Sequence, residues 1–229
     1  MSLRSLGYTV GGLFVLILLV AYWEGARPYV SIVKYSTPPG FCKFDNTNKV
    51  DAGYLDAMSN FARVGGFSVV AAYADCRELA EARKSGAFIP TKIGILRWLR
   101  TTDRPPPQFI SEACDHLRKS GVSDEQKALT SHYVAEFSNG KSSLKDVLPL
   151  GVLDEVRASV CYEAKLMKGG IAGNGDVTLL DMSAMTTLGN QPIAIHQWTS
   201  YRDESSIAAA LASLKTIYSD FAALNGKAN

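Results

Sequence analysis

Residue types that build metal and catalytic centres are scarce in this sequence. It has three histidines, and none has the spacing of a zinc-binding H-E-x-x-H motif: His116, His132 and His196. Its four cysteines include no C-x-x-C pair, which argues against a thioredoxin-type or zinc-ribbon site. The G-x-S-x-G motif of many serine hydrolases is also absent. We therefore expect no bound metal or cofactor, and we expect the histidines at surface or partly buried positions.

The sequence also lacks a strong bias of charge. The chain of 229 residues has 24 Lys and Arg against 22 Asp and Glu, which gives a net charge of +2. Its basic residues form no cluster of the kind that binds nucleic acid, and there is no acidic tail. Internal repeats and long low-complexity segments are absent too. The part that follows the amino-terminal leader has the length of one domain.

One long hydrophobic run is present, at the amino terminus. Residues 10–23, VGGLFVLILLVAYW, are almost all apolar. The wider segment of residues 6–23 reaches the lower limit of the length, about 18–20 residues, that a helix needs to cross a bilayer. Its aromatic ends resemble the interfacial belts of membrane helices. The side chains expected in the membrane are Leu6, Tyr8, Leu13, Phe14, Leu16, Ile17, Leu18, Leu19, Tyr22 and Trp23.

Charges beside this run predict its orientation. Arg4 and the free amine precede it, whereas Glu24 and Arg27 nearly cancel after it, so the amino terminus is expected inside the cell. A cleaved secretory signal is one alternative, but the best small-residue cut site has Glu24 two positions upstream. A buried core helix is another, although so uniform a surface has no polar face. We favour a single-pass anchor (residues 1–26) in the inner membrane and one extracytoplasmic domain (residues 27–229) in the periplasm.

The cysteine count indicates disulfides, because an even number of cysteines follows a leader that exports the domain. A bond between Cys42 and Cys76 is favoured and would close a loop of about 34 residues. Cys76 lies at the start of an expected helix, so a reactive thiolate is an alternative, as is an inert buried thiol. Cys114 and Cys161 form a second bond if the helix of the first covers the strand of the second. Two buried free thiols are the alternative for this pair.

Apolar periodicity predicts a mixture of helices and strands after the leader. Capping residues and glycines delimit helices at residues 48–64, 75–85, 110–120, 123–137 and 205–224. Strands are expected at residues 67–74, 92–100, 156–167, 176–188 and 191–201, with residues 27–35 as a further strand or an extended stalk. Short turns join the last three strands, which predicts antiparallel pairing. The expected fold class is α+β, a mainly antiparallel sheet covered by helices and preceded by one transmembrane helix.

Three short patterns give weaker indications of chemistry. Ser142 and Lys145 match S-x-x-K, but the partner motifs S-D-N and K-T-G of serine–lysine acyl enzymes are absent. The GGIAGNG stretch at residues 169–175 lacks the following helix and the Lys-Ser/Thr of a phosphate loop, so a hairpin turn is the better interpretation. The third pattern indicates either a surface for an acidic partner or a solvated strand end, and it comprises Arg97, Trp98, Arg100 and Arg104.

Two resemblances follow from these residues. Gly40-Phe41-Cys42 and Ala74-Asp75-Cys76, placed after an apolar leader, resemble a set of uncharacterised bacterial membrane-anchored or secreted proteins. The late strand–strand–strand–helix order resembles the PsbP/Mog1/DcrB-like α-β-α sandwich. Members of that superfamily mostly serve as assembly or binding factors, so the resemblance implies a non-enzymatic role. It assigns no functional residue to a position in this chain.

Three functions are consistent with the sequence. The favoured one is a membrane-anchored extracytoplasmic binding or assembly domain, with the lipid bilayer and an envelope protein as partners and no nucleic acid. The second is a small-ligand carrier with a pocket between sheet and helices. The third is an envelope enzyme that uses Cys76 or Ser142 as its nucleophile.

Overall fold

The chain divides into two compact units, Met1–Ile32 and Val33–Asn229. The computed structural model describes residues 33–226, except residues 65, 100–101, 103, 120–130, 132–141 and 172–174. The anchor expected at residues 1–26, Arg100 and His132 lie outside the described residues, as does the helix expected at residues 123–137 except for Ser131, which is helical.

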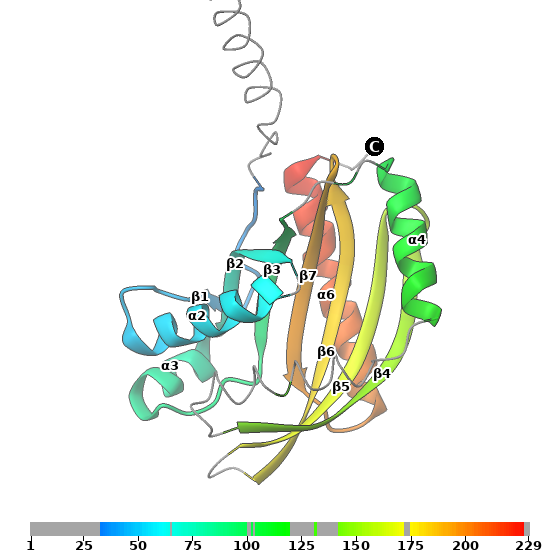
Figure 1. Cartoon of the computed structure of the whole chain (residues 1–229). Helices are drawn as coiled ribbons and strands as arrows, with labels where there is room; N and C mark the ends of the chain where they lie inside the picture. The colour runs from blue at the N-terminus through cyan, green and yellow to red at the C-terminus, as the bar shows by residue number, and fades with distance from the viewer. Residues whose placement is uncertain are drawn as a thin grey trace, which may run out of the picture. The chain divides into compact units, whose positions relative to one another are not determined.

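The second unit is built on one sheet of seven strands (Figure 1). All neighbouring strands run antiparallel, in the order β1-β2-β3-β7-β6-β5-β4. Strand β7 lies between β3 and β6, so it joins the early strands of the chain to the late ones. The strands are β1 (Phe41–Lys43), β2 (Phe67–Asp75), β3 (Lys92–Trp98), β4 (Ser142–Val156), β5 (Val160–Ile171), β6 (Gly175–Leu188) and β7 (Gln191–Ser200).

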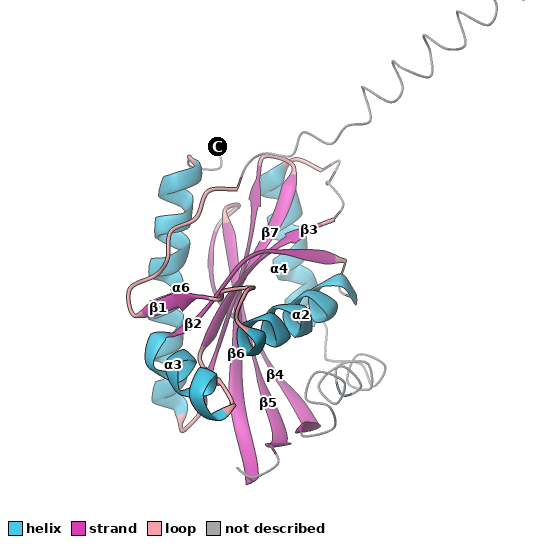
Figure 2. Ribbon diagram, turned by 90° about the vertical axis from the view of Figure 1, so that its left-hand side faces the viewer, coloured by secondary structure: helices cyan, strands magenta, loops and turns pink. Residues whose placement is uncertain are grey.

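Helices cover both faces of this sheet (Figure 2). One face carries α6 (Glu204–Asn225), and the other carries α2 (Lys49–Val64), α3 (Cys76–Ser85) and α4 (Pro106–Lys119). Successive strand residues alternate between the two layers, as the period of a strand requires. Ile93, Ile95, Ile193 and Ile195 belong to the core beneath α6, and Leu96 and Ala194 belong to the opposite layer. The predicted α+β class with an antiparallel sheet covered by helices is confirmed.

Helix α6 is the main cover of one sheet face. Asp203 begins it with a capping box, in which its side chain accepts from the backbone and Ser206 bonds back to the cap. Its inner stripe, Ala210, Leu214, Ile217 and Phe221, is buried. Among the described residues it is also the one helix long and apolar enough to cross a membrane, with a mean hydropathy of 1.3. Because its apolar stripe packs on the sheet, α6 is a core helix of this domain.

The predicted strand boundaries are wrong in the middle of the chain. Strand β4 was not expected, and Val156 is its last residue rather than the first residue of the next strand. Pro149 and Gly151 interrupt the apolar pattern of β4, and its pairing with β5 shifts register three times. A proline and bulges are tolerated here because β4 is an edge strand.

Two smaller expectations also differ from the structure. The described part of the first expected strand, residues 33–35, has no strand structure, and the first strand is β1. The turn predicted at residues 169–175 is shorter in the structure. Gly169–Ile171 belong to β5, and Gly175 begins β6.

Candidate functional site

Five polar side chains lie together in the middle of the sheet, on the face that carries α2, α3 and α4. Three adjacent strands supply them. Direct cross-strand pairing joins Glu163 to Ser183, Ser183 to His196, and Lys165 to Asp181. Side chains of paired residues point to the same face of a sheet, so the five form one group. We name this group, Glu163, Lys165, Asp181, Ser183 and His196, the polar cluster.

Asp181 is the centre of the polar cluster. Only 2% of its side chain is exposed, and its two oxygens face different partners. Lys165 Nζ lies 3.1 Å from Oδ2, and His196 Nδ1 lies 3.1 Å from Oδ1. Burial alone would raise the pKa of Asp181, but the charges and hydrogen bonds of Lys165 and His196 outweigh it and hold that pKa well below its usual range. In turn the charge of Asp181 raises the pKa of Lys165. The centre is therefore an ionised carboxylate–ammonium pair.

An aromatic ring and a glycine hold His196 in place. The imidazole stacks on the indole of Trp198, with ring centroids 5.4 Å apart and planes 14° from parallel. Gly94 of β3 lies directly opposite His196. A Cβ at Gly94 would be 3.2 Å from Met58 Sδ of α2 and 3.3 Å from the indole. The missing side chain thus gives the room in which Trp198 packs between the sheet and α2.

The chemistry of the polar cluster is that of an oriented histidine without an activated nucleophile. With Asp181 ionised, His196 Nδ1 carries the proton of their hydrogen bond, and Nε2 is left as the second polar atom of the ring. Ser183 Oγ donates its single proton to Glu163 Oε1 at 2.8 Å, so this proton is not shared with the histidine. Among the described residues, no three His, Cys, Asp or Glu side chains converge as a metal site would require. The polar cluster can therefore link three strands and carry charge. Its serine donates to a carboxylate and not to the histidine, so the described residues of the cluster do not form a serine–histidine catalytic pair.

The first disulfide lies at one edge of the sheet. Cys42 of β1 is bonded to Cys76, the first residue of α3, with a Cα–Cα distance of 4.9 Å. The backbone N–H of Cys76 also donates to Gly40 O at 3.0 Å. Asp75 caps α3 by accepting from the backbone N–H groups of Arg77 and Glu78. The pairing favoured from the sequence is present, and the thiol of Cys76 is used in it, so no free nucleophile exists there.

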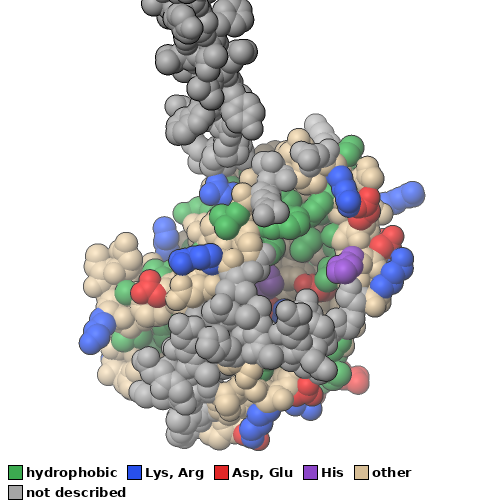
Figure 3. All heavy atoms as spheres, in the orientation of Figure 1, with side chains coloured by type: hydrophobic (Ala, Val, Ile, Leu, Met, Phe, Trp, Pro, Cys, Tyr) green, Lys and Arg blue, Asp and Glu red, His purple; other side chains and the backbone are tan. Residues whose placement is uncertain are grey.

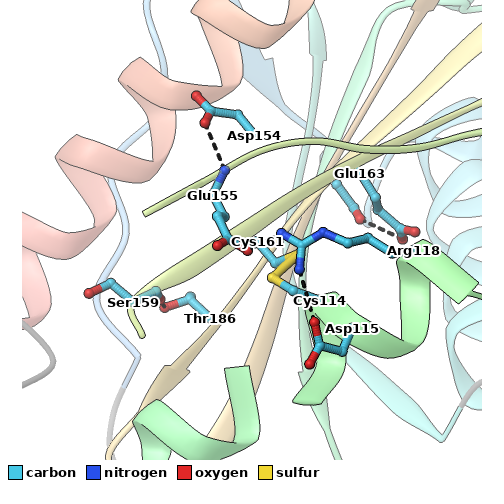
Figure 4. Close-up of a disulfide and its surroundings, with 10 residues drawn as sticks. Cys114, Asp115, Arg118, Asp154, Glu155, Ser159, Cys161, Glu163 and Thr186 are labelled. Carbon is cyan, nitrogen blue, oxygen red and sulfur yellow. Dashed lines mark hydrogen bonds and ion pairs between the residues drawn. A yellow bond between two sulfur atoms is a disulfide. The ribbon is translucent and has the colours of Figure 1, made fainter. Parts of the chain in front are cut away.

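The second disulfide joins α4 to the start of β5 (Figure 4). Cys114 of α4 is bonded to Cys161 of β5, and both residues are buried. One turn further along α4, Arg118 binds Asp115 of the same helix and Glu155 of β4, so a surface ion pair also joins α4 to the strand next to β5. Helix α4 therefore covers the strand of Cys161, which is the condition that the sequence set for this bond.

The other residues with predicted chemistry lie apart from the polar cluster. Ser142 begins β4, and the ammonium of Lys145 lies 2.6 Å from Asp176 Oδ1 in an exposed ion pair. An S-x-x-K enzyme needs its lysine as a base beside the serine, and here the charge is engaged by a carboxylate. His116 is exposed on α4. At the end of β3, Trp98 stacks on Phe67 and contacts Phe109.

A second buried ion pair was missed in the sequence. Asp51, in the first turn of α2, has a fully buried side chain that accepts from Arg83 Nη2 at 2.5 Å. It also accepts from the backbone N–H of Asp45 at 2.8 Å. Burial would raise the pKa of Asp51, but these donors lower it. Asn48 caps α2 as its place at the start of the expected helix indicates, since its side chain accepts from the backbone N–H groups of Val50 and Asp51.

A small cavity lies between β3 and α6, on the α6 side of the sheet. It has a volume of about 10 Å³ and is lined by Tyr35, Ile93, Ile95, Ile217 and Phe221, among others. That is room for about one water molecule. It is too small for an organic ligand, so the carrier hypothesis gains no support from it.

Comparisons with known proteins give no family for this chain. No protein-family model matches the sequence, and no curated protein matches it. The two resemblances described above therefore stay predictions, and the functional argument depends on the residues of this chain.

Proposed function

We propose that this chain is a membrane-anchored extracytoplasmic domain with a binding or assembly role. The observation that carries the proposal is the use of all four cysteines in two disulfides. Disulfides persist in oxidising compartments outside the cytoplasm and are rare inside it. Each bond joins a helix to the sheet, so both crosslinks belong to the fold itself and fit a domain that works in such a compartment.

The leader supports the membrane part of this proposal. Residues 6–23 have the length and the aromatic ends of a single transmembrane span, and the charges around them favour the amino terminus inside. In this proposal residues 1–26 anchor the chain in the inner membrane, and residues 27–229 work in the periplasm beside an envelope protein partner.

The chemistry of the described residues favours binding over catalysis. The thiol of Cys76 is in a disulfide, and the proton of Ser183 is donated to Glu163. The carrier alternative would need a pocket much larger than the water-sized cavity at α6. The enzyme alternative would need a free nucleophile beside a base. Both alternatives thus have less support than a domain that binds through its surface.

Fractionation and thiol mapping of the full-length chain test this proposal. We expect the chain in the membrane pellet after carbonate extraction and its domain open to protease added from the outer side of the membrane. Non-reducing peptide mapping should recover the Cys42–Cys76 and Cys114–Cys161 pairs without free thiols. A chain lacking residues 1–26 is the matched control and should not pellet. A full-length chain that is soluble with reduced cysteines would overturn the proposal.

Active-site probes test the binding role separately. A fluorophosphonate reports activated serines and iodoacetamide reports reactive thiols. We expect neither probe to label the folded protein at Ser142, Ser183 or Cys76, because the hydroxyl of Ser183 donates to Glu163, the sulfur of Cys76 is in a disulfide, and Lys145, the S-x-x-K partner of Ser142, is paired with Asp176. Rapid labelling at a single one of these sites would support the enzyme alternative instead.

A further inference from the structure

Large apolar side chains are exposed mainly at one end of the domain. Among the described residues, four are prominent: Leu99 is 59% exposed, Val156 is 53%, Leu148 is 47% and Leu224 is 41%. Leu99 directly follows β3, Val156 is the last residue of β4, and Leu224 lies in the last turn of α6. Leu148 differs from these three because it lies in the middle of β4, eight residues before Val156.

Strand register places the first two of these residues at the same end of the sheet. A single row of paired residues crosses the sheet, in the order Leu96, Ala194, Met185, Cys161 and Glu155. Leu99 lies just beyond this row at one side, and Val156 lies just beyond it at the other. Neighbouring strands are about 4.8 Å apart, so the two side chains are separated by roughly 19 Å along this end.

Helix length brings Leu224 to the same end. Helix α6 begins after β7 ends and runs back along the sheet. Its 22 residues and the 10 residues of β7 both correspond to about 33 Å, so α6 ends where β7 begins. The pairing of Gln191 with the backbone of Trp98 puts the start of β7 next to Leu99. Figure 1 shows the carboxyl end of α6, near the letter C, at this end of the sheet.

The described chain also begins at this end. Lys34 N donates to Asn225 Oδ1 at 2.9 Å, and Asn225 Nδ2 donates to Lys34 O at 2.7 Å. The residue before them, Val33, is buried in the core beneath α6. The described chain therefore begins beside Leu224. We name this part of the molecule, with Leu99, Val156, Leu224 and Lys34, the Leu99 end.

The charge at the Leu99 end is mostly positive. Lys34, Arg63 and Arg157 are exposed there, at the chain entry, at the end of α2 and in the turn after Val156. The nearby carboxylates of Glu112 and Glu155 are each bound by an arginine, and Asp220, one turn before Leu224, is the exposed carboxylate of α6 at this end. Exposed apolar side chains together with an excess of exposed basic groups are the combination that binds an anionic lipid surface.

We propose that the Leu99 end lies against the anionic headgroups of the bilayer in which the leader is anchored, an inference that rests on the proposed function. Nine residues separate Trp23 from Val33, so a fully extended connection spans at most about 35 Å. The tether thus keeps this end near lipid at a high effective concentration. The apolar groups are spread along a broad end rather than gathered in a groove, which suits a flat lipid surface.

Site-specific fluorescence in proteoliposomes tests the inference on the full-length chain. A single added cysteine, Leu99→Cys, is labelled with a fluorophore, and Leu148→Cys is the matched control within β4. Mass spectrometry confirms one label per chain and four native cysteines in disulfides. In vesicles that contain brominated anionic lipids, we expect quenching at position 99 to exceed that at position 148 by about threefold or more. Replacing the anionic lipid with a zwitterionic one should reduce this difference.

The outcomes separate this inference from the proposed function. If the chain does not pellet with the vesicles, the anchor itself is wrong and the proposed function fails. If the chain is inserted but positions 99 and 148 are quenched equally, the Leu99 end does not touch lipid and only this inference fails. Energy transfer between labels at position 99 on different chains, without lipid quenching, would assign the surface to a second copy and would also overturn it.

Discussion

Asp181 is an ionised carboxylate in a position where water is almost excluded. Desolvation disfavours such a charge, and the side chain keeps it because Lys165 and His196 contact both of its oxygens. Each of the three residues comes from a different strand of the sheet. The ion pair therefore links β5, β6 and β7 through side chains, in addition to the backbone ladder.

Removing the charge of Asp181 should destabilise the protein. The Asp181→Asn substitution keeps the shape of the side chain but leaves Lys165 without its counter-ion. We expect the free energy of unfolding to fall by about 2–3 kcal/mol, less than for a fully dry pair because Lys165 is 30% exposed. Denaturation in urea measures this loss. The control is Asp176→Asn in the exposed pair with Lys145, which should cost less than about 1 kcal/mol, and similar losses in both variants would contradict the argument.

The same carboxylate should make stability depend on acid. In the unfolded chain the pKa of Asp181 is near 3.8, and in the folded protein it is lower. As pH falls, the unfolded chain takes up the proton first, so the stabilisation is present above about pH 4 and is lost below it. The loss between pH 7 and pH 3 should be smaller for Asp181→Asn than for the natural chain. Other carboxylates titrate alike in both proteins, and equal losses would show that Asp181 is not responsible.

At the scale of elements, local signals in the sequence located the helices well. Asp75 caps α3 and Asp203 caps α6, at or within two residues of the predicted helix starts at residues 75 and 205, because a cap depends on residues within one turn. Strand β4 was missed because its signal is not local. Pro149 and Gly151 break its apolar alternation, and the strand exists since β5 offers it a partner edge.

The packing of α2 on the sheet should be sensitive to the smallest added group at Gly94. A Cβ there would lie within 3.2–3.3 Å of Met58 and Trp198, so Gly94→Ala should lower the free energy of unfolding by about 1–3 kcal/mol. Gly53 of α2 is the matched control, because a Cβ at this exposed position meets nothing within 4 Å. Gly53→Ala should be neutral or stabilising, by up to about 1 kcal/mol. Thermal unfolding of the two variants measures both effects, and a neutral Gly94→Ala would refute the proposed packing.

The two disulfides should contribute similar stability. Their cysteines are 34 and 47 residues apart, and the chain-entropy model gives about 4 kcal/mol for each. Replacing both cysteines of either bond with alanine should therefore lower the free energy of unfolding to a comparable extent. Denaturation in guanidinium chloride measures the loss relative to the oxidised natural chain, and the reduced natural chain shows the loss of both bonds together. A double variant as stable as the oxidised natural chain would mean that the bond adds nothing to the fold.

At the scale of the whole molecule, the polar cluster lay beyond sequence reasoning. Alternation along β5 puts Cys161, Glu163 and Lys165 on one face of the strand. Because two of these residues are charged, the sequence alone indicates that this face is polar and solvated. That face is in fact the one that α4 covers at Cys161, and its charges meet partners from β6 and β7. Which helix covers which face is decided by the complete packing of the chain. A lysine and an aspartate at matching positions of neighbouring predicted strands were the one signal that could have indicated the pair.

Separation of the leader from the domain is the prediction that concerns the whole chain. The boundary between the two compact units falls at Ile32 and Val33, and the buried core of the second unit includes Val33 itself. A chain of residues 27–229, exported with a cleavable signal, should therefore fold with both disulfides and show the same denaturation midpoint as the full-length chain in detergent. It should also be released from the membrane fraction, since a surface patch without its tether binds lipid weakly. A lower midpoint or scrambled disulfides would show instead that the first 26 residues are part of the folding unit.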